Sequence, residues 1–170
     1  NAANELKSRG ITILLIHPAW VQTDMGGPTA PVSIEQSITG VRRIIDKAFS
    51  QGSVEAILAA LDREAQNGTD QSQWSAATAQ IIGGKSPTSL KLALAQMRYG
   101  AIHSFEACMA AEFRIVSRIV YGRDMVEGVR AVIIDKDNKP RWSPATLGEV
   151  SDAMIEAYFK RLPDGELAIG

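Results

Sequence analysis

The chain has 170 residues, of which 45% are hydrophobic and 22% charged, a composition typical of a folded globular protein. Its 18 basic and 19 acidic side chains give a net charge of −1, so no overall basic field favours nucleic acid as a partner. The single cysteine, Cys108, excludes an internal disulfide and a cysteine-rich zinc site. The longest apolar run, residues 11–16, is too short to cross a bilayer, and the first residues lack a signal-peptide pattern. We therefore expect no membrane partner and a cytoplasmic location.

The only strand that the sequence predicts is Ile11–Ile16, a continuous β-branched and aliphatic run. Such a run is typical of a strand buried on both faces of a parallel sheet, and it stops at the His17-Pro18 pair. The residues from Trp20 to Pro31 contain prolines and two adjacent glycines and are expected to form a loop. Because the rest of the chain offers no second strand, this strand is expected to be isolated.

Helical periodicity dominates the chain after residue 33. Ser33 opens a capping box, and Ser86-Pro87 is an N-cap followed by proline at the first helical position. Apolar stripes predict helices at residues 34–48, 54–61, 74–82, 87–97, 105–120, 129–133 and 147–158, with a polar turn at 135–140. The strongest stripe consists of Phe105, Met109, Phe113, Val116 and Val120, and we expect it to be the main core-facing surface, with Phe113 buried.

Residues 1–45 resemble the C-terminal part of short-chain dehydrogenase/reductases. The resemblance is carried by Arg9–Pro18, Trp20–Pro28 and Ser33–Ser37. It implies a fragment of an α/β Rossmann-type domain in which Val21 would lie near the nicotinamide carboxamide of NAD(P) and Thr23 near the carboxamide or the pyrophosphate. The glycine-rich phosphate loop and the catalytic Ser and Tyr-x-x-x-Lys of that family are missing, so NAD(P) is expected to bind only if this fragment were completed.

Residues 46–170 resemble the C-terminal part of 3-hydroxyisobutyryl-CoA hydrolases, within the enoyl-CoA hydratase (crotonase) superfamily. The matching stretches follow in the family's order over nearly three quarters of the chain. They are residues 53–61, 85–91, 112–114, 127–131, 134–137, 140–142 and 162–166. The resemblance implies a mainly α chain, the helical C-terminal region of a crotonase-type fold, with one isolated strand and loop left from the Rossmann-type domain.

The crotonase resemblance also implies where substrate would be held. In that family a lysine after the Glu-Gly motif contacts the CoA nucleotide, often that of a neighbouring subunit. The matching residue here is Lys136, with Lys139 and Arg141 close by. The oxyanion hole and catalytic carboxylates belong to an N-terminal β/α spiral whose motifs are not in this sequence, so we assign no catalytic residue. No cofactor is required, because CoA is part of the substrate.

The leading hypothesis is therefore a region of 3-hydroxyisobutyryl-CoA hydrolase type, whose reaction is acyl-CoA thioester hydrolysis in valine catabolism, expected to be inactive by itself. The expected partners are an acyl-CoA substrate and either a second copy of the chain or the missing catalytic half. Two alternatives remain open: a remnant of an NAD(P)-dependent short-chain oxidoreductase, and a non-enzymatic helical interaction module.

Several charged residues allow two interpretations. Lys85 and Lys91 could hold a phosphate at a helix start or simply be solvated. Glu112 is expected to make a structural ion pair, with Arg118 or a facing helix, rather than act as a base. Glu127 and Arg130 have the i, i+3 spacing of a helical ion pair. His17 and His103 lack nearby carboxylates, so no metal site is expected; Cys108 is expected to be a small core residue.

Overall fold

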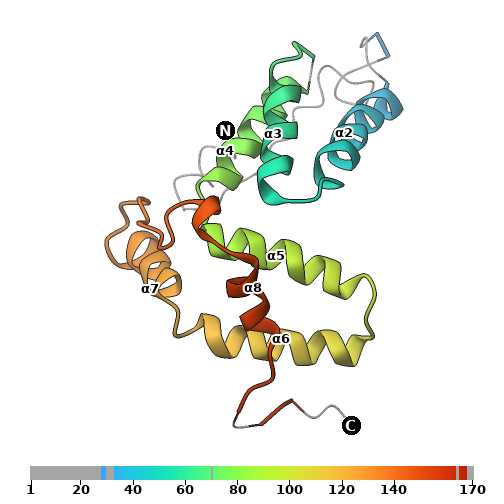
Figure 1. Ribbon diagram of the computed structural model, residues 1–170. Coiled ribbons are helices and arrows are strands. Elements are labelled where there is room, and N and C mark those ends of the chain that lie inside the picture. The colour runs from blue at the N-terminus through green and yellow to red at the C-terminus, as the bar shows by residue number, and fades with distance from the viewer. Residues whose placement is uncertain (1–27, 30–32, 70, 164, 168–170) are drawn as a thin grey trace. The chain divides into compact units, whose positions relative to one another are not determined.

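The structure is a computed structural model that describes residues 28–29, 33–69, 71–163 and 165–167. The predicted strand at 11–16 and most of the loop at 20–31 lie outside these residues. These described residues divide into two compact units, one within residues 28–50 and 58–80 and the other within residues 51–57 and 81–167. Every regular element in the described ranges is a helix, and no strand occurs there, in agreement with the mainly α prediction (Figure 1).

The first unit is built on α2 (Ile34–Phe49), most of α3 (Val54–Ala65) and most of α4 (Ser72–Gly83). The α2 helix begins directly after Ser33, where the capping box predicts it. Its buried positions, Ile44 and Ala48, are four residues apart and so share one helical face. The side chains buried in this unit are Ile44, Ala48, Ala60, Leu61, Glu64, Ser75 and Thr78.

A buried carboxylate ties α2 to α3 within the first unit. Glu64 is 5% exposed, forms an ion pair with Lys47 and accepts a hydrogen bond from the side chain of Asn67 at 3.1 Å. The Lys47 ammonium, with help from Asn67, lowers the pKa of Glu64 despite the burial. The carboxylate therefore stays charged at neutral pH and holds the two helices together.

The second unit is centred on α5 (Pro87–Gly100), α6 (Phe105–Ile119) and α8 (Asp152–Phe159). The Ser86 hydroxyl accepts a hydrogen bond from the Ser89 amide at 3.1 Å, which confirms the predicted N-cap. The α8 helix contacts both α5 and α6 (Figure 1). Leu92, Ile115 and Ile155 of these helices form a hydrophobic core with Val150, which lies just before α8. The core is flanked by Ala95, Ile119, Tyr158 and Phe159.

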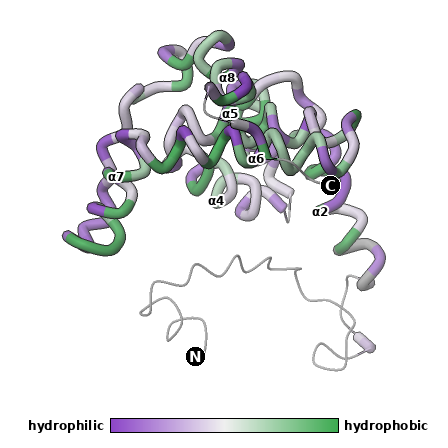
Figure 2. Tube along the Cα trace, turned by 90° about the horizontal axis from the view of Figure 1, so that it is seen from below, coloured by the Kyte–Doolittle hydropathy of each residue, from purple (hydrophilic) through white to green (hydrophobic). Residues whose placement is uncertain are grey.

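The buried face of α6 is not the predicted one. Ala111 and Ile115 are buried, whereas Phe113 is 37% exposed and Val116 is 50% exposed. Phe105 and Val120 are exposed as well. The expectation that Phe113 lies in the core is therefore wrong: the shorter Ala111 and Ile115 face α5 and α8, and the larger apolar stripe points away from them. Figure 2 shows the hydrophobic stretches of α6 and of the α7 segment in green.

After α6 the chain turns at Gly122 into α7 (Arg123–Val129) and the π-helical turn η1 (Arg130–Ile134). The predicted polar turn follows η1 without regular structure. The predicted helix at 147–158 is two elements, because the 3₁₀ turn η2 (Leu147–Glu149) is separated from α8 by the extended Val150. The Thr146–Glu149 capping box belongs to η2, and Ser151 separately caps α8. No helix among the described residues is long and apolar enough to cross a membrane.

Candidate functional site

A groove of about 480 Å³ opens in the second unit beside the start of α5 and the α7–η1 segment. Its walls are largely apolar, with Val129, Val132 and Ile133 from the α7–η1 segment and Trp142 after the loop. Its polar end carries Lys85, Ser86, Ser89, Arg123 and Asp124. This combination of an apolar wall and a polar end suits an amphipathic ligand or a packed segment of protein.

Hydrogen bonds fix the polar end of the groove. The Asp124 carboxylate accepts hydrogen bonds from the Ser86 hydroxyl and from the Ser143 amide, the latter at 2.8 Å. The indole N–H of Trp142 donates to the carbonyl oxygen of Gly84 at 3.0 Å. Asp124 lies in the first turn of α7 and is not its N-cap, which is Gly122. Its role is therefore to join the starts of α5 and α7 to the segment after the loop.

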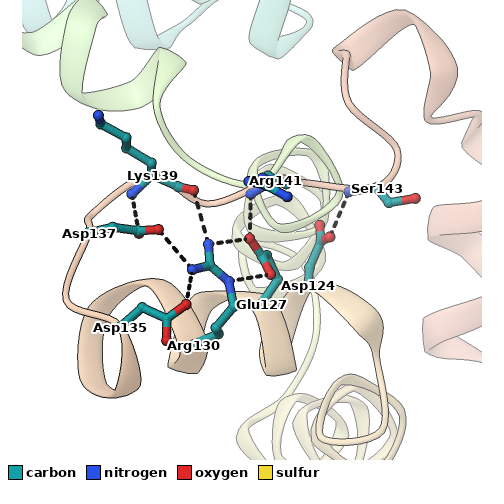
Figure 3. A network of polar contacts seen from close by, with 8 residues as sticks. All are labelled: Asp124, Glu127, Arg130, Asp135, Asp137, Lys139, Arg141 and Ser143. Atoms are coloured by element: carbon teal, nitrogen blue, oxygen red, sulfur yellow. Dashed lines mark hydrogen bonds and ion pairs between the residues drawn. The ribbon is translucent and has the colours of Figure 1, made fainter.

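The loop at 135–141 is organised around Arg130, as Figure 3 shows. The guanidinium of Arg130 forms a bidentate pair with Glu127, with Nε–Oε2 and Nη2–Oε1 distances of 2.9 and 2.8 Å. Its Nη1 also donates to Asp135 and, at 2.8 Å, to Asp137. The predicted Glu127–Arg130 pair is confirmed, and it is part of a larger network.

The network changes the acidity of its members. The Arg130 guanidinium, with the Arg141 amide, lowers the pKa of Glu127 to about 2. Arg130 and the Lys139 amide likewise lower the pKa of Asp137. In return, the three carboxylates raise the pKa of Arg130. Glu127 and Asp137 are therefore fully ionised at neutral pH, and their charges are directed at Arg130.

The candidate CoA contacts Lys136 and Lys139 lie in this loop, and both are exposed. Neither ammonium forms an ion pair with a described residue, in contrast to the neighbouring carboxylates. In Figure 3 the side chain of Lys139 extends away from Arg130. The structure thus leaves two cations available for an anion. The other predicted contacts, Val21 and Thr23, lie outside the described residues.

Lys85 and Lys91 do not act together. Lys85 is exposed and lines the groove. Lys91 pairs with Glu55 at 2.9 Å and donates to the carbonyl oxygen of Val150 at 3.0 Å. This ion pair lowers the pKa of Glu55. Lys91 is therefore a structural link within the second unit, neither a phosphate ligand at the helix start nor a merely solvated lysine.

The charged residues of α6 are structural too, with partners that the sequence did not predict. Glu112 accepts a hydrogen bond from the Gln96 side chain at 2.9 Å and makes no pair with Arg118. Arg114 forms an ion pair with Glu166, which lowers the pKa of that carboxyl group. Arg118 donates to backbone carbonyl oxygens of Arg114, Tyr158 and Arg161. Arg114 and Arg118 thereby hold the end of α8 against α6.

The remaining candidates that the structure describes, His103 and Cys108, form no reactive site. His103 stacks on Tyr99 with a ring separation of 3.6 Å. Cys108 is only partly buried, with Sγ 4.0 Å from the carbonyl oxygen of His103, and His17 lies outside the described residues. Among the residues that the structure describes, no group of three or more His, Cys, Asp or Glu side chains could hold a metal ion.

Sequence reasoning missed most of the Arg130 network. The i, i+3 spacing identifies Glu127 as a partner because both residues lie on one helical face. Asp135 and Asp137 follow Arg130 by five and seven residues, and they reach it only because the chain turns back after η1. Their acidic character within a short polar turn next to an arginine was the one signal available.

Comparison with known proteins places these features in a family. Residues 21–159 match the model of the enoyl-CoA hydratase/isomerase family. The chain is 40% identical over 122 residues to 3-hydroxyisobutyryl-CoA hydrolase 1 of Arabidopsis thaliana, covering 70% of this chain and 32% of that protein. It is 41% identical over 125 residues to the mitochondrial 3-hydroxyisobutyryl-CoA hydrolase of Gallus gallus, covering 74% and 31%.

A solved structure agrees with these sequences. The carnitinyl-CoA dehydratase of Mycobacterium thermoresistibile is 30% identical and superposes with a TM-score of 0.63, over 80% of this chain and 36% of that one. The chain spans about a third of the length of the curated relatives it matches. The family match includes residues 21–45, and these comparisons do not show a short-chain dehydrogenase fragment. The chain belongs to the enoyl-CoA hydratase/isomerase family.

Proposed function

We propose that the chain is the helical part of an acyl-CoA thioester hydrolase of the 3-hydroxyisobutyryl-CoA type. The observation that carries this proposal is the 40–41% identity to hydrolases of that name over more than two thirds of the chain. Because the chain spans about a third of those proteins, the reaction and its substrate are proposed for the whole protein of which such a region is a part.

In this proposal the loop at 135–141 holds the CoA part of the substrate. CoA carries several phosphate groups, and Lys136 and Lys139 offer two exposed ammonium groups without a carboxylate partner among the described residues. Exposed ion pairs contribute about 0–1 kcal/mol each, so the chain alone should bind CoA weakly, with a Kd on the order of millimolar.

The chemical step requires groups from another part of the fold. Thioester hydrolysis needs hydrogen-bond donors aimed at the developing oxyanion and a positioned acid or base. The carboxylates of the second unit described above already accept hydrogen bonds or form ion pairs with arginine, lysine, amide or backbone donors. We therefore propose that the catalytic groups come from the β/α part of the crotonase fold.

The exposed apolar face of α6 supports the proposal that a β/α part of the fold packs against this helical part. Phe113, Val116 and Val120 lie on a helix whose opposite face already packs into the core. A monomeric soluble protein rarely exposes such a continuous stripe. The occupant we propose is the β/α part, whether it belongs to the same polypeptide or to a second one. The chain's relatives are about three times as long as the matched region, which leaves room for such a part.

Three finer points remain predictions. The role in valine catabolism rests on the resemblance alone. A cytoplasmic location is an expectation from composition, whereas the Gallus gallus relative is named as mitochondrial. NAD(P) contacts at Val21 and Thr23 would require a completed dehydrogenase domain, and the alternative oxidoreductase function is not favoured by any of the relatives described above.

The test is hydrolysis of 3-hydroxyisobutyryl-CoA, followed by the release of free thiol. The chain alone should give the rate of buffer, and the chain mixed with a separately expressed β/α part of a family member should give a faster rate. The control is the β/α part by itself. Hydrolysis by the chain alone that disappears in Glu112→Gln or Glu127→Gln would contradict the proposal, because it would place a catalytic carboxylate in this region.

A further inference from the structure

Every N–H group of the Arg130 guanidinium donates a hydrogen bond within the protein. A guanidinium has five N–H groups. In this protein Nε donates to Glu127, and Nη1 donates to Asp135 and Asp137. Nη2 donates to Glu127 and, at 3.1 Å, to the carbonyl oxygen of Lys139 (Figure 3). The Arg130 side chain, which is 27% exposed, thus contacts four other residues within the thirteen residues 127–139. No other arginine of the described residues gathers three carboxylates.

The backbone of the loop depends on these contacts. Lys136 and Asn138 have φ values of 55° and 54°, a conformation that non-glycine residues rarely adopt. The Asn138 amide donates to the carbonyl oxygen of Ala131 at 3.0 Å, and the Lys139 amide donates to Asp137 at 2.8 Å. Because Asp137 is held by Arg130, the arginine supports the unusual turn on which Lys136 and Lys139 are carried.

The same contacts separate the charges of the loop. Residues 127–141 contain three carboxylates and, besides Arg130, the cations Lys136, Lys139 and Arg141. With the carboxylates directed at Arg130, the two lysines are left without an acidic partner among the described residues. Without Arg130, the carboxylates of Asp135 and Asp137, one to four residues from the lysines, would be free to pair with them and would compete with any anion.

We propose that Arg130 is a positioning residue that turns the 135–141 loop into an anion site for the phosphate groups of CoA. This inference rests on the proposed function. Arg130 itself does not touch the ligand, because its donors are all occupied. It acts by holding Glu127, Asp135 and Asp137 on the inner side of the loop, so that Lys136 and Lys139 face the phosphates.

The experiment is an NMR titration of the full chain with CoA. Arg130→Gln should weaken binding by about twofold to fivefold, the effect of about one exposed charge interaction. The Lys136→Ala/Lys139→Ala double variant should weaken it at least as much. Arg63→Gln is the charge control and should leave binding unchanged, since Arg63 is exposed on α3 and forms no ion pair with any described residue.

A pH series distinguishes positioning from a general loss of structure. In Arg130→Gln the pKa values of Glu127 and Asp137 should rise toward their ordinary values, whereas in the unaltered chain Arg130 holds the pKa of Glu127 at about 2 and lowers that of Asp137. Dephospho-CoA, whose diphosphate keeps its charge, should therefore regain affinity in Arg130→Gln as the pH falls from 7 to 4.5. The unaltered chain should show no such recovery, and an unfolded variant would show none either.

The outcomes separate the inference from the proposed function. If the unaltered chain does not bind CoA, both are overturned. If it binds through Lys136 and Lys139, but Arg130→Gln binds equally well, only the role of Arg130 is overturned. Should Arg130→Gln lose its helical circular dichroism, Arg130→Lys carries the test. Lysine keeps the charge but cannot fill five donor positions, so twofold to threefold weaker binding supports the inference and unchanged binding overturns it.

Discussion

The inner and outer faces of α6 differ in what covers them. The inner face, with Ala111 and Ile115, is buried against α5 and α8. The outer face, with Phe113, Val116 and Val120, is larger and more apolar but stays exposed among the described residues. Hydrophobic periodicity therefore identifies an apolar face without telling whether the chain itself covers it. The uncovered face is the one that we assign to the catalytic part of the family fold.

The largest expected effect is on stability. Ile115→Ala should lower the free energy of unfolding by about 2–5 kcal/mol, because it opens a cavity in a core of only four buried residues. Phe113→Ala should cost less than half as much, since its side chain is already partly in water. Urea unfolding at low protein concentration measures both. Equal losses would show that the two faces are buried alike.

The outer face should also drive self-association. A stripe of exposed apolar side chains on one helix gains free energy when it is buried against another surface. Light scattering at tens of micromolar should detect assemblies of the unaltered chain, and the Phe113→Ser/Val116→Ser/Val120→Ser variant should be closer to a monomer. Met97→Ser, at an exposed apolar position on α5, is the control and should change little. If the unaltered chain is purely monomeric, the interpretation of the outer face of α6 as an uncovered packing surface is wrong.

A smaller loss of stability is expected in acid, because the polar 135–141 loop contains ion pairs whose strength depends on pH and the apolar core does not. Arg130 and the Arg141 amide hold the pKa of Glu127 at about 2, below its ordinary value of 4.5. The unfolded chain therefore takes up a proton more readily, and the stabilisation by this group is complete above pH 4.5 and lost as the pH falls toward 2. Glu64 and Glu166, with pKa values lowered by Lys47 and Arg114, act in the same direction.

The check is a series of urea midpoints at pH 7, 4.5, 3.5 and 2.5. Glu127→Gln should start less stable at pH 7 and lose less between pH 4.5 and 2.5 than the unaltered chain. Glu112→Gln is the matched control, because Glu112 is bonded to a neutral amide. An identical loss in Glu127→Gln and the unaltered chain would show that the Arg130 network does not stabilise the fold.

What the sequence could predict is local. The start of α2 after Ser33 and the N-cap at Ser86 follow from a few neighbouring residues, and both are confirmed. The Glu127–Arg130 pair is confirmed for the same reason, since the i, i+3 geometry is fixed by the helix. The candidate ligands Lys136 and Lys139 came from a family resemblance; the structure places both in one exposed loop.

What the sequence could not predict depends on the path of the chain. The pairing of Lys91 with Glu55, 36 residues away, requires knowledge of how α5 meets the start of α3. The reach of Asp135 and Asp137 back to Arg130 requires the left-handed turns at Lys136 and Asn138. The exposure of Phe113 requires knowledge of which face of α6 packs against α5 and α8. None of these follows from periodicity or local spacing.

The central claim is that the outer face of α6 packs against the β/α catalytic part of the crotonase fold. Titration of the unaltered chain with a separately expressed β/α part of a family member, followed by sedimentation velocity, tests it most directly. We predict a complex that the Phe113→Ser/Val116→Ser/Val120→Ser variant fails to form and that Met97→Ser forms normally. A complex that survives the triple substitution, or no complex with the unaltered chain, would contradict the account.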